Sequence, residues 1–553
     1  MRKLITKETV TLLSLIFLAV LLRFFKLSEY PVQLNHDEVT QLYDAISIAE
    51  TGRDVYGNFL PFIFPSIGDY KPPFYTYITS IFYIFFGGGE LTIRLPAALF
   101  GTLMIPAIYL FVIKFIGDKR IALFAAFFTA IAPFEIFFSR KGFESGTGIF
   151  LMLLGFSCLF IYLGRKKHLI WIYLAAVIFA ANVYIYFSHA IIIPLLLVAF
   201  FLIYRQNFVK NLTKFLIPSL LFISLILPLI LLIVVNSDTR FRSQTVFITQ
   251  DVNLGRQIGY VQTNNVLLDT FLRYKITFDF IINRYLQQFN PIYLFGNGLD
   301  FINQSPIGVG PLLLIQLPFL ILGIWYLIKS NHLNEQKKFI GVWIILGMLP
   351  SGLTFEQHSP HRSIMVFTML NVISGAGLYI FIIFVNNLSR KIRIKIVIFS
   401  AVVLAFAINF IYFIHMYFVN YPFEKSQYLQ YPFKQVSQYI WSQYNNFDQI
   451  IFDPQFGQTA PIIGVGAQYY IAYYGDYLPE KLQKDYKIGK KPRETKFDKF
   501  SIRQVYWPED KQLKNVLIVA SPWSIRMDDI DERLIVKRFD FYDGQAAFYA
   551  IKL

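Results

Sequence analysis

Long apolar runs recur along this chain and limit what it can fold into. Each is near the length of about twenty residues with which a helix crosses a bilayer. We expect eleven spanning helices, at 8–26, 91–116, 121–139, 147–164, 169–188, 190–204, 215–235, 307–328, 339–355, 363–386 and 395–418. With 55% hydrophobic and 16% charged residues in 553, the chain is too apolar for an ordinary soluble enzyme or a disordered protein. The expected fold class is an all-α polytopic membrane protein with a C-terminal extracytoplasmic α/β domain.

The basic residues are unevenly distributed between the two sets of loops. One set holds nineteen Lys and Arg against three acids, which accounts for the whole net charge of +16. The positive-inside rule assigns these loops to the cytoplasm, so the charge is a topology signal and argues against nucleic acid as a partner. We therefore expect a multi-pass plasma-membrane protein with its N-terminus in the cytoplasm. An odd number of spans then places the C-terminal domain outside the cytoplasm.

Three large segments fall on the outer side. The first outer loop, 27–90, carries eight acids and two basic residues. The second large loop, 236–306, contains a candidate helix near 265–288 and a Gly-rich turn at 296–298. We expect a membrane domain at 1–418 that includes both loops, and a soluble α/β domain at 419–553 with strands near 449–452, 515–520 and 546–551. In the first loop, 36–52 has the pattern of an amphipathic helix on the membrane surface with Gly52 as its stop, and 72–86 is expected to be a second, non-spanning juxtamembrane helix. Lys71 precedes Pro72 and is therefore expected to be extended. The lone Cys158 is expected to be a packed side chain.

Four polar clusters at the outer ends of spans could carry chemistry. Acidic residues at a helix start also complement the helix dipole, and outer cations also bind lipid headgroups, so each cluster has an ordinary structural explanation. Together they suit transfer from a phosphate-linked lipid donor: a carboxylate as general base, and cations that stabilise the departing phosphate. The clusters are Asn35-His36-Asp37-Glu38, Asp69-Tyr70-Lys71-Pro72-Pro73, Arg140-Lys141-Gly142-Phe143-Glu144 and Glu356-Gln357-His358-Ser359-Pro360-His361-Arg362.

The motifs in these clusters resemble those of the GT-C glycosyltransferases. Within that superfamily they are similar to the protein O-mannosyltransferase-like group, family 39, which includes the lipid A aminoarabinose transferases. The resemblance covers roughly 1–418 and rests on Asp37-Glu38 after the first span, Lys71-Pro72-Pro73, Arg94-Leu95-Pro96, Ser139-Arg140 with Glu144, and Pro360-His361-Arg362. It implies a helical module with two juxtamembrane helices and an inverting transfer of sugar from a polyprenyl-phosphate donor.

The resemblance also implies roles for individual residues. Asp37 and its neighbour Glu38 would be catalytic, with Asp37 as the base or as a carboxylate that orients the acceptor. Lys71, Arg362, Arg140 and His361 would bind the donor phosphate. Glu144 and Asp69 would contact the acceptor or a metal. In aminoarabinose transferases an acid directly precedes the lysine, whereas here Tyr70 intervenes, so no cofactor is assigned and a divalent metal ion stays open.

The acceptor is not readable from the sequence and could be a protein hydroxyl, a lipid or a glycan. A polytopic transporter or flippase is the alternative, but it should carry charged residues in mid-span and repeated broken helices. A third reading is a membrane-anchored scaffold whose 419–553 domain binds a partner.

Overall fold

The computed structural model of the chain describes residues 6–67, 69–164, 168–208, 213–235, 246–263, 265–296, 306–356, 358–388, 392–485, 487–488 and 494–553. Its contacts form two compact units. The first comprises Met1–Phe25 and Pro96–Tyr417, and the second comprises Lys26–Leu95 and Phe418–Leu553. The boundary expected at 418 matches one limit of the second unit, but the first outer loop groups with the C-terminal residues and not with the helices of 1–418.

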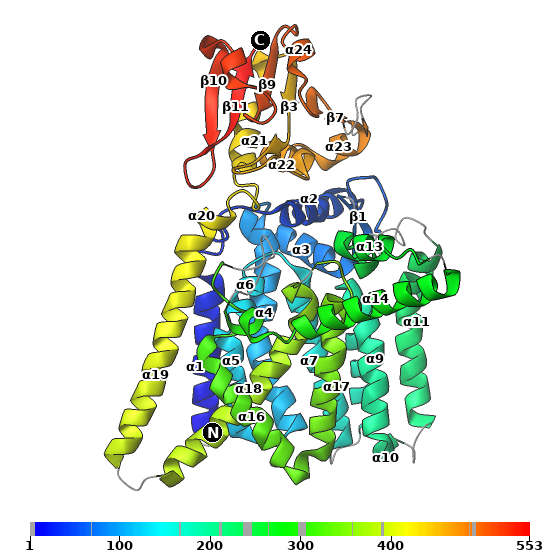
Figure 1. Cartoon of the computed structure of the whole chain (residues 1–553), viewed down its shortest axis with the longest axis vertical. Helices are drawn as coiled ribbons and strands as arrows, with labels where there is room; N and C mark the ends of the chain where they lie inside the picture. Colours follow the sequence, from blue (N-terminus) through cyan, green and yellow to red (C-terminus); the bar gives the residue numbers. More distant parts are fainter. Residues whose placement is uncertain are drawn as a thin grey trace. The chain divides into compact units, whose positions relative to one another are not determined.

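The first unit is built from helices (Figure 1). Each expected span overlaps one or two of them, although the helix in the run expected at 307–328 begins only at Leu317. They are α1 (Lys7–Phe24), α4 (Glu90–Phe115, whose first turn lies in the second unit), α5 (Lys119–Ile131), α6 (Pro133–Ser139), α7 (Glu144–Leu163), α8 (Ile170–Val183), α9 (Phe187–Ile203), α10 (Arg205–Phe208), α11 (Thr213–Val235), α13 (Val252–Gly259), α14 (Val266–Gln287), α15 (Pro291–Phe295), α16 (Leu317–Lys329), α17 (Asn334–Gly352), α18 (Pro360–Leu388) and α19 (Ile392–His415).

Fewer of these helices qualify as separate spans than the eleven expected. Among the described residues, five are long and apolar enough to cross a membrane alone, and up to seven cross if each of two bent pairs is one span. One pair is α5 and α6, bent by 60° at Ala132, because a residue before proline is driven out of helical geometry. The other joins the runs expected at 307–328 and 339–355, which meet at 87°. Helices α8 and α9 have 14 and 17 residues.

Glycines allow the tightest helix crossing in the first unit. A Cβ on Gly377 of α18 would lie 1.7 Å from the carbonyl oxygen of Phe319, and one on Gly323 of α16 would lie 1.9 Å from that of Ile373. No side chain fits either gap, so α16 and α18 approach backbone to backbone, as small residues permit in membrane helices.

The second large outer loop contains the helix expected at 265–288, found as α14. It runs across α17 (Figure 1), and the Tyr285 hydroxyl donates to the carbonyl of Ile345 at 2.9 Å. Residues 236–245 and 297–305 of the loop lie outside the described residues, as does most of the Gly-rich turn expected at 296–298.

The second unit begins with the first outer loop. It contains α2 (His36–Thr51), the antiparallel pair β1 (Phe64–Ser66) and β2 (Asp69–Lys71), and α3 (Pro73–Phe86). As predicted, α2 ends at Gly52, whose φ of 69° is left-handed, and α3, with 14 residues, is too short to span. The polar face of α2 is also covered, because Gln483 donates from Nε2 to Ser47 Oγ at 3.0 Å and to Thr51 Oγ1 at 3.1 Å.

The C-terminal residues form the expected α/β domain. A seven-stranded mixed sheet has the order β10-β11-β9-β3-β8-β7-β6, with β3 parallel to both neighbours. Ile451, Ile518 and Ile551 lie in its apolar core. The strands are β3 (Gln449–Phe452), β6 (Lys487–Ile488), β7 (Thr495–Phe497), β8 (Phe500–Ile502), β9 (Val516–Ala520), β10 (Ile535–Asp540) and β11 (Ala546–Lys552), and β4 (Gln455–Phe456) pairs separately with β5 (Ile462–Ile463). The helices are α20 (Tyr421–Lys425), α21 (Pro432–Ser442), α22 (Ala467–Tyr474), α23 (Pro479–Asp485) and α24 (Trp507–Asp510).

Candidate active site

Asp37 and Lys71 form an ion pair in the second unit. Lys71 Nζ lies 2.9 Å from Asp37 Oδ1, and the two side chains are 8% and 22% exposed respectively. Asp37 lies in the first turn of α2, where the backbone N–H groups favour a negative charge. Lys71 is the last residue of β2 and precedes Pro72, in the extended geometry that the sequence predicted. A partly exposed carboxylate therefore lies against a nearly buried cation.

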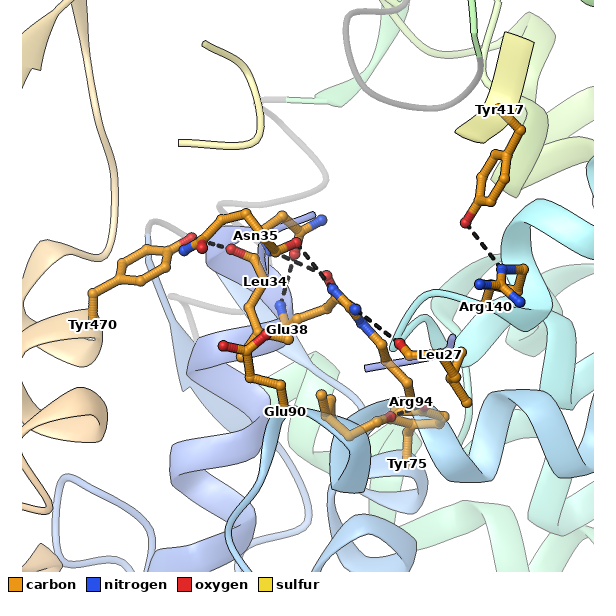
Figure 2. A network of polar contacts seen from close by, with 12 residues as sticks. Leu27, Leu34, Asn35, Glu38, Tyr75, Glu90, Arg94, Arg140, Tyr417 and Tyr470 are labelled. Carbon is orange, nitrogen blue, oxygen red and sulfur yellow. Dashed lines mark hydrogen bonds and ion pairs between the residues drawn. The ribbon is translucent and has the colours of Figure 1, made fainter. Parts of the chain in front are cut away.

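Glu38, the other expected catalytic residue, is fully buried and bonded on both oxygens. Oε2 accepts from the backbone N–H of Asn35 at 3.1 Å, while Asn35 Oδ1 accepts from the N–H of Glu38 at 2.8 Å, which makes a capping box. Oε1 pairs with Arg94 Nε at 3.1 Å (Figure 2). This geometry fits a positioning residue, which fixes the helix start that carries Asp37.

Arg94 ties three parts of the first outer loop together. Besides Glu38, its Nη1 donates to the carbonyl of Leu27 and its Nη2 to that of Gln33, both at 3.0 Å. The motif Arg94-Leu95-Pro96 entered the sequence argument only through the resemblance, and no site role was expected for the arginine. An arginine near the start of an apolar run was the available signal, since a charge there needs a partner.

Tyrosines complete this frame within the second unit. The Tyr470 hydroxyl of α22 donates to the carbonyl of Leu34 at 2.7 Å, and the Tyr75 hydroxyl of α3 donates to that of Ile93 at 2.6 Å (Figure 2). Burial raises the pKa of Tyr470 well above its usual range, so the phenol keeps its proton and stays a donor. The segment before Asp37 is therefore held by the C-terminal domain as well as by Arg94.

Asp44, which lies two turns after Asp37 on α2, is also buried. Burial raises the pKa of its carboxyl well above the usual range, and the neighbouring Asp54 adds to the rise, although Oδ1 accepts from the N–H of Val55 at 3.2 Å. Asp44 does not belong to the site, but it makes the stability of this unit depend on pH.

The residues expected to bind a metal give no support for such a site. Asp69 lies in β2 opposite Ser66, and its side chain is outside the described part of the structure. Within the described side chains, no group of three His, Cys, Asp or Glu residues could hold a metal ion. The divalent ion therefore stays a prediction, and no step is derived through it.

In the first unit, Arg140 follows α6 and is buried. Its Nη1 donates to the carbonyls of Leu22 at 3.0 Å and Arg23 at 3.3 Å, and its Nε donates to the Tyr417 hydroxyl at 3.3 Å (Figure 2). The guanidinium thus joins the end of α1 to the π-helical turn at Met416–Asn420. Its expected phosphate-binding role stays a prediction beside this structural one. Glu144, the first residue of α7, is buried as well.

The residues of the cluster from Glu356 to Arg362 contact one another. Arg362 Nη1 pairs with Glu356 Oε2 at 2.9 Å, and Ser359 Oγ donates to the same oxygen at 3.0 Å. Ser359 Oγ also lies 3.2 Å from Nδ1 of His361, whose ring packs 6.2 Å from that of Phe143. This brings two of the predicted clusters of the first unit together. Gln357 lies outside the described residues.

Comparisons with known proteins fit this fold. Residues 70–232 match the family model described as dolichyl-phosphate-mannose-protein mannosyltransferase. The structure of ArnT from Cupriavidus metallidurans in the apo state is similar at a TM-score of 0.56 and 13% identity. The match covers 99% of this chain and 98% of that chain. The structure of the same protein bound to undecaprenyl phosphate is similar at a TM-score of 0.53 and 13% identity. The match covers 98% of this chain and 97% of that chain.

A third solved structure matches only in part. This is the Archaeoglobus fulgidus oligosaccharyltransferase tethered with an acceptor peptide, which is similar at a TM-score of 0.53 and 13% identity. The match covers 85% of this chain and 63% of that chain. No curated protein sequence matches the chain. At these identities the structures establish the fold alone, which is similar to that of ArnT.

The family match and the fold together define the class of protein. The chain is a multi-pass membrane protein with a C-terminal domain that contains a sheet, and it is similar to membrane glycosyltransferases in fold and over residues 70–232.

Proposed function

We propose that the protein transfers a sugar from a polyprenyl-phosphate donor to an acceptor hydroxyl on the outer face of the membrane. The donor class is supported by the ArnT relative bound to undecaprenyl phosphate and by the mannosyltransferase family match. The outer face is supported by the charge of the predicted loops, because the segments with Asp37 and Lys71 lie on the side poor in Lys and Arg.

The observation that carries this proposal is the pair of Asp37 and Lys71, 2.9 Å apart on a frame fixed by Glu38 and Arg94. A general base needs a carboxylate that a hydroxyl can reach, and Asp37 keeps part of its surface exposed. A departing phosphate needs a cation that is already in place, and Lys71 is held by the strand end and by Asp37. One lysine therefore serves both the base and the leaving group.

The reaction is a single displacement. As the acceptor oxygen forms its bond to the anomeric carbon, Asp37 takes the proton from the hydroxyl. The bond from that carbon to the phosphate oxygen breaks, its electron pair leaves with the polyprenyl phosphate, and Lys71 stabilises the charge. Attack opposite the leaving group inverts the anomeric configuration. The phosphate is a good leaving group without protonation, so no general acid is required.

The test is Asp37→Asn in the full-length protein in nanodiscs, with a panel of short-chain polyprenyl-phosphate hexoses and pentoses. Release of polyprenyl phosphate and product formation are followed together. We expect the rate to fall by about 10²-fold or more, because the amide cannot accept the proton. Asp528→Asn, at an exposed acid of the same unit, is the matched control and should keep the full rate. Undiminished transfer by Asp37→Asn would remove the proposed role.

A further inference from the structure

A polar cleft of about 420 Å³ lies in the second large outer loop, within the first unit and apart from the proposed chemistry. Its volume falls in the range of about 300–1,000 Å³ that small-ligand sites occupy. Its walls come from α13 and α14, which lie next to each other (Figure 1). The lining residues are Asn253, Arg256 and Gln257 of α13 with Phe280, Asn283, Arg284 and Gln287 of α14.

The spacing of these residues puts each set on one face of its helix. On α13 the second and third follow the first at three and four residues, and on α14 the others follow Phe280 at three, four and seven residues. Residues three or four apart are neighbours on a helix surface. Each helix therefore presents one stripe of mainly polar side chains to the cleft.

The two walls are fixed to each other and to a neighbouring segment. Asp251 is the N-cap of α13, and its Oδ2 pairs with Nη2 of Arg284 on α14. The Arg284 guanidinium also lies over the ring of Phe280, with Cζ 5.3 Å from the ring centroid. Nε2 of His358, before α18, lies 3.4 Å from the carbonyl oxygen of Gln287. A ligand therefore meets a site that is already formed, and its binding loses little conformational entropy.

The cleft contains one cation that is not neutralised. Arg284 is paired with Asp251, whereas in the part of the chain that the structure describes Arg256 pairs with no acidic side chain. Arg256 is also exposed, so a ligand can reach it. A guanidinium binds a carboxylate or a phosphate through two parallel hydrogen bonds. The charge of the cleft therefore favours a ligand with an acidic group.

Carboxamides form most of the remaining lining. Asn253, Gln257, Asn283 and Gln287 each carry a carbonyl that accepts and an amide group that donates hydrogen bonds. A sugar hydroxyl also donates and accepts, so a row of hydroxyls can satisfy both kinds of group. A bare anion only accepts, and it would leave the carboxamide oxygens without donors. Phe280 adds an apolar surface, and the negative face of its ring attracts the C–H groups of a sugar.

We propose that the cleft between α13 and α14 binds an acidic saccharide. Its acidic group pairs with Arg256, and its hydroxyls bond to the carboxamides of both helices. The inference concerns binding and is independent of the proposed transfer, because it is measured without a sugar donor.

The test uses the full-length protein in nanodiscs, with binding measured by isothermal titration calorimetry at constant ionic strength. Trigalacturonate is the acidic saccharide, and maltotriose is a neutral saccharide of the same length. Inorganic phosphate represents an anion without a sugar ring, and glycerol 3-phosphate represents a lipid headgroup without its chains.

Two variants change the cleft, and each has a matched control. Arg256→Gln removes the unneutralised cation, and Lys275→Gln removes a cation of the same loop that is 59% exposed and does not line the cleft. Gln257→Leu removes a carboxamide, and Gln262→Leu removes an exposed one just beyond α13. The two cleft residues are exposed, so neither change disturbs the packing of the unit.

We expect trigalacturonate to bind about tenfold or more tightly than maltotriose, phosphate or glycerol 3-phosphate. Arg256→Gln should remove this preference and leave the binding of maltotriose unchanged. Gln257→Leu should weaken the binding of both saccharides by about threefold or more, because a hydrogen bond to each is lost. Both controls should bind all four compounds like the original protein.

Three results would overturn the inference. The first is no binding of trigalacturonate, and the second is binding that neither Arg256→Gln nor Gln257→Leu weakens. The third is binding of phosphate or glycerol 3-phosphate as tight as that of trigalacturonate, which would make the cleft an anion or headgroup site. Loss of transfer in Asp37→Asn, or its survival, bears on the proposed base and leaves these binding results as they are.

Discussion

Glu38 and Arg94 form a fully buried ion pair, with Oε1 and Nε 3.1 Å apart, and this pair holds the helix turn that carries Asp37. Removing one partner leaves the other charge buried without its counterion, which costs about 3–5 kcal/mol. We therefore expect Glu38→Gln to lower the melting temperature of the purified protein and to reduce transfer indirectly. Glu480→Gln breaks a pair whose side chains are 69% exposed and should leave the melting temperature unchanged.

A direct catalytic role for Glu38 would give a different pattern. Transfer would then fall at temperatures well below the melting transition, with no change in the transition itself. Thermal unfolding and initial rates measured on the same samples separate the two cases.

Lys71 is expected to act through its charge. Lys71→Met keeps much of the apolar stem but removes the cation that faces Asp37, so we expect transfer to fall by about 10²-fold or more. Lys71→Arg keeps the charge with a different shape and should retain part of the rate. Equal rates for the two variants would show that the charge is not what matters. The measurement is release of polyprenyl phosphate.

Arg362 can be tested against its own partner. If Arg362 binds the donor phosphate, Arg362→Gln should raise the donor KM by about tenfold, a loss of about 1.4 kcal/mol in binding. Glu356→Gln frees the same guanidinium from its 2.9 Å ion pair and should not raise the KM. If both variants raise it equally, the pair serves only to shape the loop between α17 and α18.

Asp44 makes the stability of the second unit depend on pH. Its pKa is raised in the folded protein by burial, whereas an unfolded Asp titrates near pH 3.9. Between these two values the folded state holds more protons, so the free energy of unfolding falls as pH rises through that window. Asp44→Asn removes this dependence. The melting temperature of Asp44→Asn minus that of the original protein should therefore increase from pH 4 upward until the folded carboxyl is ionised. For the control Asp528→Asn the same difference should not change with pH.

Local patterns in the sequence predicted the elements of the fold well. The apolar runs, the helix from 36 to 52 with its Gly52 stop, and the extended Lys71 all depend on neighbours within a few residues. The structure has a helix within each run and confirms α2 and the extended Lys71. The α/β domain was predicted for the same reason, from strands near 449–452, 515–520 and 546–551.

Relationships between distant segments were missed. The burial of Glu38 depends on Arg94, 56 residues later, and the cover on the polar face of α2 comes from Gln483. Neither follows from periodicity, because each needs the tertiary fold to bring two polar groups together. The prediction of eleven spans did not include the two sharp bends between helices, although Pro133 was a local signal for the bend between α5 and α6.

The chain passes between its two units three times, after Phe25, Leu95 and Tyr417. The C-terminal tail, which begins at Phe418, therefore forms one compact unit with the loop that carries Asp37. Tyr470 and Gln483 of the tail donate hydrogen bonds to that loop. Truncation before Phe418 would expose the buried faces of α2 and stop turnover whatever the tail binds. Single substitutions on the tail's surface can separate recognition from structural support, and truncation cannot.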